Sequence, residues 1–68
     1  MNARKMFEEL GYRYNKSEMI IEYSHFDNCI AFWINQREFY AACGNEPKDI
    51  DVDEFKAIQQ QMKELNWI

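Results

Sequence analysis

The chain contains few of the residues that build disulfide scaffolds, metal clusters or flexible linkers. Its 68 residues include two cysteines, one histidine, one proline and two glycines. Two cysteines are too few for the disulfide framework of a small secreted protein, so a reducing compartment is the expected setting. The chain also has no Cys-x-x-Cys pair and no obvious fourth ligand, so a structural zinc site is not predicted.

A long uninterrupted apolar segment is also missing. No run of about 18 apolar residues occurs, so no transmembrane helix is predicted and no membrane partner is expected. The N-terminal region carries Arg4 and Lys5, but Glu8 and Glu9 interrupt the apolar segment that a signal peptide would need. These absences together predict a cytoplasmic protein.

Positive charge is scarce, with eight Lys and Arg against twelve Asp and Glu and a formal net charge of −4. Binding to nucleic acid is not expected, because it needs Lys and Arg to neutralise phosphates and the basic residues here are scattered. Acidic residues concentrate between positions 46 and 54. The favoured interpretation of this run is a turn and a helix start. The alternative is an acidic patch for a basic partner, made by Asp49, Asp51 and Asp53.

Aromatic and aliphatic residues, by contrast, are plentiful. Hydrophobic residues make up 47% of the chain and aromatic residues 16%. Large rings bury much apolar area per residue, which lets a short chain offset the entropy that it loses on folding. The sequence therefore predicts one small folded domain that spans residues 1–68.

The spacing of apolar residues predicts a helix near the N-terminus. Asn2 is a suitable N-cap, and Gly11 is a suitable residue for the turn that ends the helix. The apolar positions between them recur at i, i+3, i+4 and i+7: Ala3, Met6, Phe7 and Leu10.

A second helix is predicted near the C-terminus, and its start is the strongest local signal in the chain. Asp51 and Glu54 can each accept a hydrogen bond from the other's backbone N–H, which is the capping box. Asn66 suits the end of this helix because asparagine tolerates the left-handed conformation. The expected core-facing stripe is Phe55, Ile58, Met62 and Leu65, with Trp67 and Ile68 folding back behind it.

Three strands are predicted between the helices, over residues 19–24, 29–34 and 38–43. Alternating or continuous apolar residues mark each strand, and polar turns separate them. Residues 13–18 are interpreted as a polar connection. The predicted fold class is therefore α+β in the order α-β-β-β-α, a three-stranded antiparallel meander with both helices packed on one face.

The alternation of side chains also predicts a strand register. The residues that face the helices are expected to pair in two rows, Met19, Ile21 and Tyr23 with Ile34, Phe32 and Ile30, and these in turn with Phe39, Ala41 and Cys43. The second pairing assumes a two-residue turn at Gln36 and Arg37, although Asn-Gln-Arg is a poor match to the usual turn sequences. A slip by one residue would invert the third strand.

On this register, Trp33 and Tyr40 are direct cross-strand neighbours on the face that the helices leave open. We expect a partner-binding patch there, formed by Trp33, Tyr40, Ile20, Glu22 and Glu38. The alternatives are an aromatic pair that only stabilises its own hairpin, and a homodimer interface across the same face.

Metal binding and catalysis are not predicted, and no cofactor is expected. The run Asp49-x-Asp51-x-Asp53 imitates the start of a calcium loop, but Glu54 stands where that loop requires glycine. Position 12 of such a loop is Gln60, which cannot replace the bidentate glutamate. The chain has no nucleophile elbow, phosphate loop or dinucleotide fingerprint, so it is predicted not to be an enzyme.

The order α-β-β-β-α at this length resembles the double-stranded RNA-binding domain. That resemblance implies RNA recognition by shape. In that family the second helix begins with a lysine-rich cluster, whereas this chain has Asp51-Val52-Asp53-Glu54 at the matching place. The resemblance is therefore limited to topology, and fold alone does not imply function.

The two predicted helices also resemble those of small phage and prophage proteins of Gram-positive bacteria. The segments that carry the likeness are ARKMFEELGY near the N-terminus and IDVDEFKAIQQQMKELNW near the C-terminus. Asn66 stands where those proteins commonly have glycine. The resemblance implies a phage accessory protein in the host bacterial cytosol, with no established activity to transfer.

The leading functional hypothesis is a non-catalytic module that binds a host or phage protein through the open sheet face. Two alternatives remain. One is a nucleic-acid-binding module on a scaffold like the double-stranded RNA-binding domain. The other is an acidic mimic of nucleic acid that inhibits a host defence or DNA-binding protein.

Overall fold

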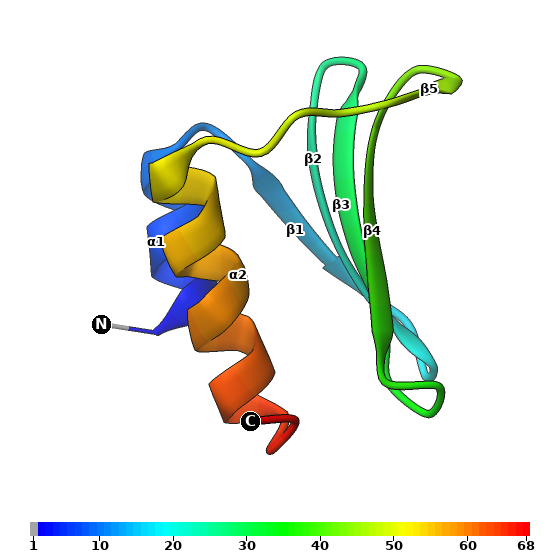
Figure 1. The fold of residues 1–68 in the computed structure, drawn as a ribbon, viewed down its shortest axis with the longest axis vertical. Helices are drawn as coiled ribbons and strands as arrows, with labels where there is room; N and C mark the ends of the chain where they lie inside the picture. Colours follow the sequence, from blue (N-terminus) through cyan, green and yellow to red (C-terminus); the bar gives the residue numbers. More distant parts are fainter. Residues whose placement is uncertain (1) are drawn as a thin grey trace.

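Two helices cover one face of an antiparallel sheet in the computed structural model, which describes residues 2–68 (Figure 1). The sheet order is β1-β2-β3-β4-β5, so every neighbour in the sheet is also a neighbour in the chain. The α+β class is confirmed. The elements are α1 (Ala3–Glu9), β1 (Arg13–Lys16), β2 (Ile20–His25), β3 (Asn28–Trp33), β4 (Glu38–Cys43), β5 (Glu46–Pro47) and α2 (Val52–Glu64).

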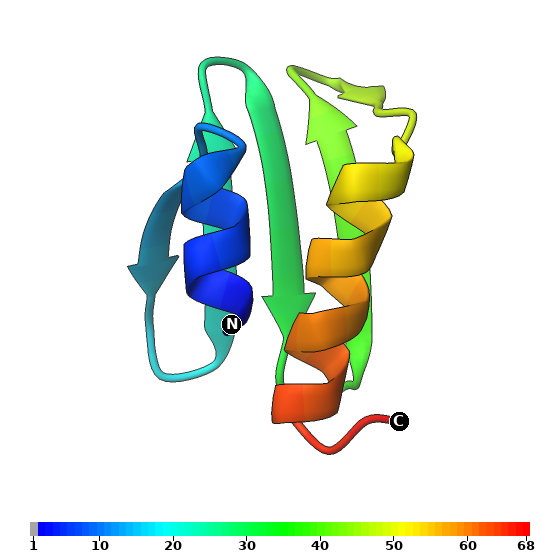
Figure 2. The same ribbon diagram turned by 90° about the vertical axis from the view of Figure 1, so that its left-hand side faces the viewer.

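The two helices lie side by side and run in opposite directions across the sheet (Figure 2). Their caps follow the sequence signals. Asn2 accepts the backbone N–H of Lys5, and Asp51 and Glu54 form both hydrogen bonds of the capping box. One further hydrogen bond joins the start of α1 to the end of α2, where the backbone N–H of Ala3 donates to the Glu64 carboxylate at 2.8 Å.

The three predicted strands are the central strands, and two short edge strands extend the sheet on either side. Residues 13–16 were expected to be a polar connection, but they form β1 and pair with β2. Tyr14 explains this pairing, because its ring packs 5.7 Å from the ring of Tyr23 and the Arg4 guanidinium lies 4.3 Å from its centroid. β5 pairs only with Ala42 and Cys43. The polar residues of β1 suit an edge strand, whose outer side faces water.

The predicted register is correct between β2 and β3 but wrong between β3 and β4. Phe32 pairs with Phe39, whereas the sequence placed it opposite Ala41. The pairing is displaced by two residues because the turn uses four residues, 34–37, and ends with Arg37 at φ 58°. A two-residue turn needs residues with positive φ, usually glycine, and this segment contains no glycine. A displacement of two preserves the face of every side chain.

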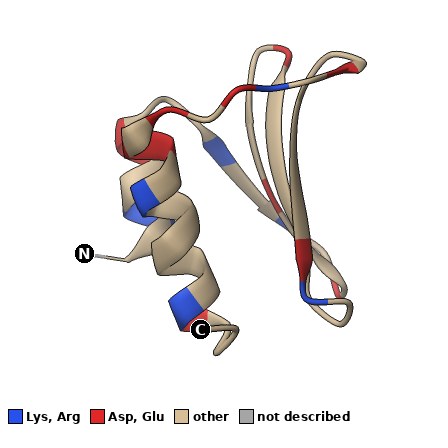
Figure 3. Cartoon of the chain, viewed as in Figure 1, with Lys and Arg blue, Asp and Glu red and all other residues tan. Residues whose placement is uncertain are grey.

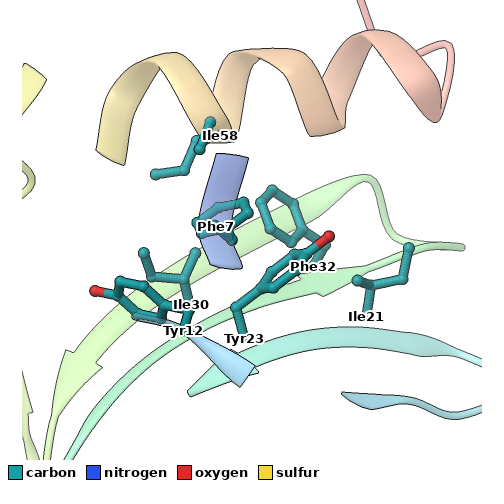
Figure 4. Packing of buried hydrophobic residues seen from close by; sticks show 8 residues of the cluster. Phe7, Tyr12, Ile21, Tyr23, Ile30, Phe32 and Ile58 are labelled. Carbon is teal, nitrogen blue, oxygen red and sulfur yellow. The ribbon is translucent and has the colours of Figure 1, made fainter. Parts of the chain in front are cut away.

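The core lies between the helix layer and the sheet and consists mainly of aromatic rings (Figure 4). Phe7 of α1 is at its centre, with its ring stacked 3.9 Å from that of Tyr23 and set edge-on to the ring of Phe32. The largest fully buried side chains are Tyr23, Phe7, Phe32, Ile30 and Ile58. Aromatic pairs in these orientations stabilise the core beyond the area that they bury.

The predicted core-facing stripe of α2 is correct at Ile58, Met62 and Leu65, which lie in or pack against the core, but wrong at Phe55. Phe55 is 53% exposed, while the buried residues of α2 are Glu54, Ala57, Ile58 and Gln61. The two polar residues are buried because each accepts a hydrogen bond from a tyrosine hydroxyl. Tyr12 donates to Glu54, and Tyr23 donates to Gln61 at 2.6 Å. Buried polar atoms that have such partners avoid the cost of desolvation.

Both helices end in the same backbone motif. In α1 the N–H of Gly11 donates to Glu8 and the N–H of Tyr12 to Phe7. In α2 the N–H of Asn66 donates to Lys63 and the N–H of Trp67 to Met62. These are the paired bonds of the Schellman motif, which requires positive φ at Gly11 and Asn66. Each motif is followed by an aromatic residue that packs against the core.

Replacing Asn66 with glycine should stabilise the fold. Asn66 has φ 60°, and a side chain in this left-handed region is strained, although less for asparagine than for most residues. Glycine removes that strain but loses more entropy on folding, so we expect a net gain of about 0.5 kcal/mol. Chemical denaturation measures it, with Asn66→Ala as the matched comparison. If the Asn66→Gly variant were less stable than the Asn66→Ala variant, the assignment of a Schellman motif at Asn66 would be wrong.

Candidate functional site: the open sheet face

One face of the sheet carries both helices, and no element of residues 2–68 covers the other (Figure 1). Strand pairing places Ile20, Trp33 and Glu38 in one cross-strand row of this open face. The next row on the same face contains Glu22, Ala31 and Tyr40. All five residues of the predicted patch therefore lie on the open face, in adjacent rows.

Trp33 and Tyr40 form the aromatic centre of this face. Their ring centroids are 6.4 Å apart and the ring planes are inclined by 25°. They were expected to be directly opposite, but Trp33 pairs with Glu38 and Tyr40 with Ala31, so the rings meet diagonally. This correction follows from the longer β3–β4 turn. Trp33 is half-buried and Tyr40 is 45% exposed, so both present ring surface to solvent.

Ala31 lies beneath the aromatic pair. Although no helix covers it, Ala31 is only 2% exposed, so the surrounding side chains of the open face shield it. A small residue here leaves room for the larger side chains that flank it on both sides.

A thiol and a carboxylate form a polar contact at the other end of the patch. The Cys29 Sγ–H donates to the Glu22 Oε2 at 3.2 Å. Burial, followed by this hydrogen bond and the charge of Glu22, raises the pKa of the Cys29 thiol to about 11. The pKa of Tyr40 is also raised, first by the charge that Cys29 would carry and then by burial. At neutral pH both groups are therefore protonated, and Cys29 is a poor nucleophile.

The predicted acidic residues lie at one end of the molecule. Asp49, Asp51 and Asp53 are exposed, and Figure 3 shows them where the chain enters α2, near other acidic segments. Asp51 is also the N-cap of α2, and Glu54, which ends the acidic run, is buried. Among residues 2–68 no group of three His, Cys, Asp or Glu side chains is arranged to hold a metal ion.

The buried partner of Glu54 was not anticipated from the sequence. The Lys48 ammonium lies 2.8 Å from the Glu54 carboxylate, which also accepts from Tyr12 and from the backbone N–H of Asp51. Burial alone would raise the pKa of Glu54, but the hydrogen bonds from Lys48, Tyr12 and Asp51 outweigh it and hold the pKa below its usual range. Glu54 is thus a buried carboxylate that stays charged.

A shallow groove of about 380 Å³ lies elsewhere, between α1 with its C-terminal end and the start of α2. It is lined by Met6, Glu9, Leu10, Asp53 and Lys56. The groove is open to solvent, and its lining combines two carboxylates and one ammonium with two apolar side chains.

Comparison of the chain with protein-family models, curated proteins and solved structures gives no significant match. In the described part of the chain, neither helix is long and apolar enough to cross a membrane.

Proposed function

We propose that this protein is a non-catalytic interaction module that binds another protein through the open sheet face. The observation that supports it is the Trp33–Tyr40 pair, which lies on the uncovered side of the sheet with ring surface exposed. Tryptophan and tyrosine are enriched among the residues that dominate protein–protein binding energies. Scattered single apolar residues need no explanation, but two adjacent rings in an apolar patch favour an interface.

The charges around the rings indicate the chemistry of the partner. Glu22 is half-buried and Glu38 is exposed, and both lie on the same face as the rings. A partner that presents lysine or arginine next to an apolar contact would complement this arrangement. We propose a host or phage protein in a bacterial cytosol, a setting supported by the likeness of both helix ends to phage proteins.

The open face is small, which limits the strength of any complex through it alone, whether with a second copy or with another protein. β2, β3 and β4 have six residues each, roughly 20 Å, while β1 and β5 have only four and two. With strands about 4.8 Å apart, the face covers on the order of 400 Å². A stable interface of standard size buries about 800 Å² on each partner. Self-association through the open face would therefore be weak, and sedimentation of the wild type beside Tyr40→Ala measures it.

Replacing Trp33 with alanine should reduce partner capture by at least tenfold. Immobilised wild-type protein, Trp33→Ala and Phe55→Ala are compared for capture of the same protein from a bacterial lysate, followed by purified titration. Phe55 is a matched control, because it is also an exposed ring but lies on α2. Circular dichroism checks that each variant is folded. Equal capture by wild type and Trp33→Ala would overturn the proposal.

The acidic end of the molecule supports a second candidate, an acidic mimic of nucleic acid that inhibits a DNA-binding or defence protein. The observation that favours this candidate is the cluster of Asp and Glu residues where α2 begins (Figure 3). Changing Asp49, Asp51 and Asp53 to asparagine tests it, because asparagine retains the N-cap at Asp51. Loss of partner binding in this variant, with Trp33→Ala unaffected, would favour the mimic over sheet-face binding.

A nucleic-acid-binding function makes the opposite electrostatic prediction. Its affinity would rise steeply as salt is lowered, because binding would release counterions from phosphates. We expect no mobility shift of double-stranded RNA at low salt, since the net charge is −4.

A further inference from the structure

The outer edge of β4 is only partly covered. β5 is two residues long and pairs with Ala42 and Cys43, after which the Lys48 N–H donates to the Ala41 carbonyl at 3.1 Å. The chain then leaves the sheet for α2 (Figure 1). The first half of β4 therefore has no neighbouring strand on its outer side among residues 2–68.

The pairing pattern shows which backbone groups point out of this edge. In an antiparallel pair, alternate residues direct both their N–H and C=O to the same neighbour. The backbone carbonyl of Ala41 is bonded toward the β5 side, so the backbone N–H and C=O of Phe39 also point to that side. The backbone groups of Glu38 and Tyr40 point toward β3. The N–H and C=O of Phe39 have no backbone partner within the described chain.

The side chains beside this gap are apolar on one face and acidic on the other. Phe39 is 41% exposed on the helix side of the sheet. Glu38 and Tyr40 are exposed on the open side. Natural edge strands are commonly protected by lysine, proline or a bulge, and the segment from Glu38 to Ala41 has none of these.

We propose that an extended segment of a partner protein binds antiparallel to β4 and completes the fifth strand where β5 ends. The free N–H and C=O of Phe39 specify an extended backbone as the occupant, since they match the bonding groups of a strand. The alternation of side chains along a strand also specifies the side chains of this partner segment. The partner's residue opposite Phe39 is apolar. The residues on either side of it are lysine or arginine, and they face Glu38 and Tyr40. This site adjoins the Trp33 patch and shares Glu38 and Tyr40 with it, but its main-chain bonds are made by Phe39 at the edge of the sheet.

A second copy of this chain fits the edge less well. In a symmetric antiparallel pair centred on Phe39, each copy's strand would meet the other's Lys48 within two residues. Such a pair would place Tyr40 of one copy opposite Glu38 of the other, so neither glutamate would meet a cation, and each copy carries a net charge of −4.

The test uses nuclear magnetic resonance of the ¹⁵N-labelled full chain with the peptide acetyl-Lys-Val-Lys-Val-Lys-amide, added to millimolar concentration. We expect saturable binding and at least tenfold slower exchange of the Phe39 amide. The Tyr40 amide, which already faces β3, should change little. Glu38→Gln should bind the peptide more weakly. Glu22→Gln, the same change on β2, two strands away from this edge, should bind it like wild type, which separates this site from the rest of the open sheet face.

Two N-methylated peptides supply the decisive comparison. Methyl groups on the valine nitrogens remove the donors that face Phe39 and should abolish binding, whereas methyl groups on the lysine nitrogens point away from β4 and should be tolerated. The proposal is overturned by absence of binding, by an unchanged Phe39 exchange rate, or by equal binding of both methylated peptides. Phe39 protection that appears with protein concentration alone would assign the edge to a second copy instead.

Discussion

Replacing Glu54 with glutamine should destabilise the fold by about 3 kcal/mol, the lower end of the range for removing one partner of a buried ion pair. The Glu54 side chain is 7% exposed and that of Lys48 is 15% exposed, so solvent cannot replace the lost charge effectively. Glutamine can still accept from Tyr12, but it leaves the ammonium of Lys48 without its counter-charge. For a 68-residue domain this is a large fraction of the total free energy of unfolding.

The same contact predicts how stability depends on pH. Because the folded pKa of Glu54 is lower than its unfolded value near 4.3, the carboxylate stabilises the fold fully above that pH. This contribution is lost as pH falls through the folded pKa. The difference in unfolding free energy between wild type and Glu54→Gln should therefore shrink below about pH 4, as measured by urea denaturation from pH 7 to 3.

Glu46→Gln is the matched control for this experiment. It removes the same charge from an exposed residue of β5, so its effect should stay within about 0.5 kcal/mol at every pH. If both substitutions cost the same, the buried ion pair would contribute nothing particular to stability.

Local signals in the sequence were sufficient for the helix ends. The capping box at Asp51, the N-cap at Asn2 and the left-handed residues Gly11 and Asn66 all depend on residues within a few positions of one another. Their geometry is set by neighbouring backbone groups, so tertiary contacts are not needed to recognise them.

The edge strands and the second hairpin could not be predicted in this way. β1 is a strand because Tyr14 packs on Tyr23 and Arg4, which are nine and ten residues away. Residues 13–16 have little strand signal of their own. The β3–β4 turn lacks glycine, and its length was decided by Arg37 adopting positive φ. The two-residue displacement left the predicted open face intact, because side chains alternate with a period of two.

Hydrophobic periodicity correctly identified Ile58, Met62 and Leu65 on the core-facing side of α2, but it missed two polar residues and misplaced Phe55. Glu54 and Gln61 are polar, yet both are buried by hydrogen bonds to tyrosines 42 and 38 residues away in the sequence. Phe55 is apolar but lies one residue beyond the buried position, where it is 53% exposed. A chain with four tyrosines offers hydroxyl donors to such positions, but their pairing is visible only in the folded structure.

Replacing Phe7 with alanine should lower the free energy of unfolding by about 3–5 kcal/mol. Phe7 is fully buried and its ring contacts those of Tyr12, Tyr23 and Phe32. It also supplies the carbonyl that accepts from Tyr12 at the end of α1. Alanine would leave a cavity between a seven-residue helix and the sheet, and so short a helix has little stability without packing.

Phe55→Ala makes the same chemical change at the position where hydrophobic periodicity wrongly placed a core residue. Its ring is about half exposed, so the expected loss is below about 1 kcal/mol. Thermal unfolding followed by circular dichroism compares the two variants directly, since each kcal/mol corresponds to several degrees in a domain of this size. Equal losses would mean that α2 turns Phe55 toward the core, which would rotate Glu54 and Gln61 away from their tyrosines. A large loss for Phe7→Ala alone would show that Phe7 is the main contact between α1 and the sheet, beside the smaller contributions of Met6 and Leu10.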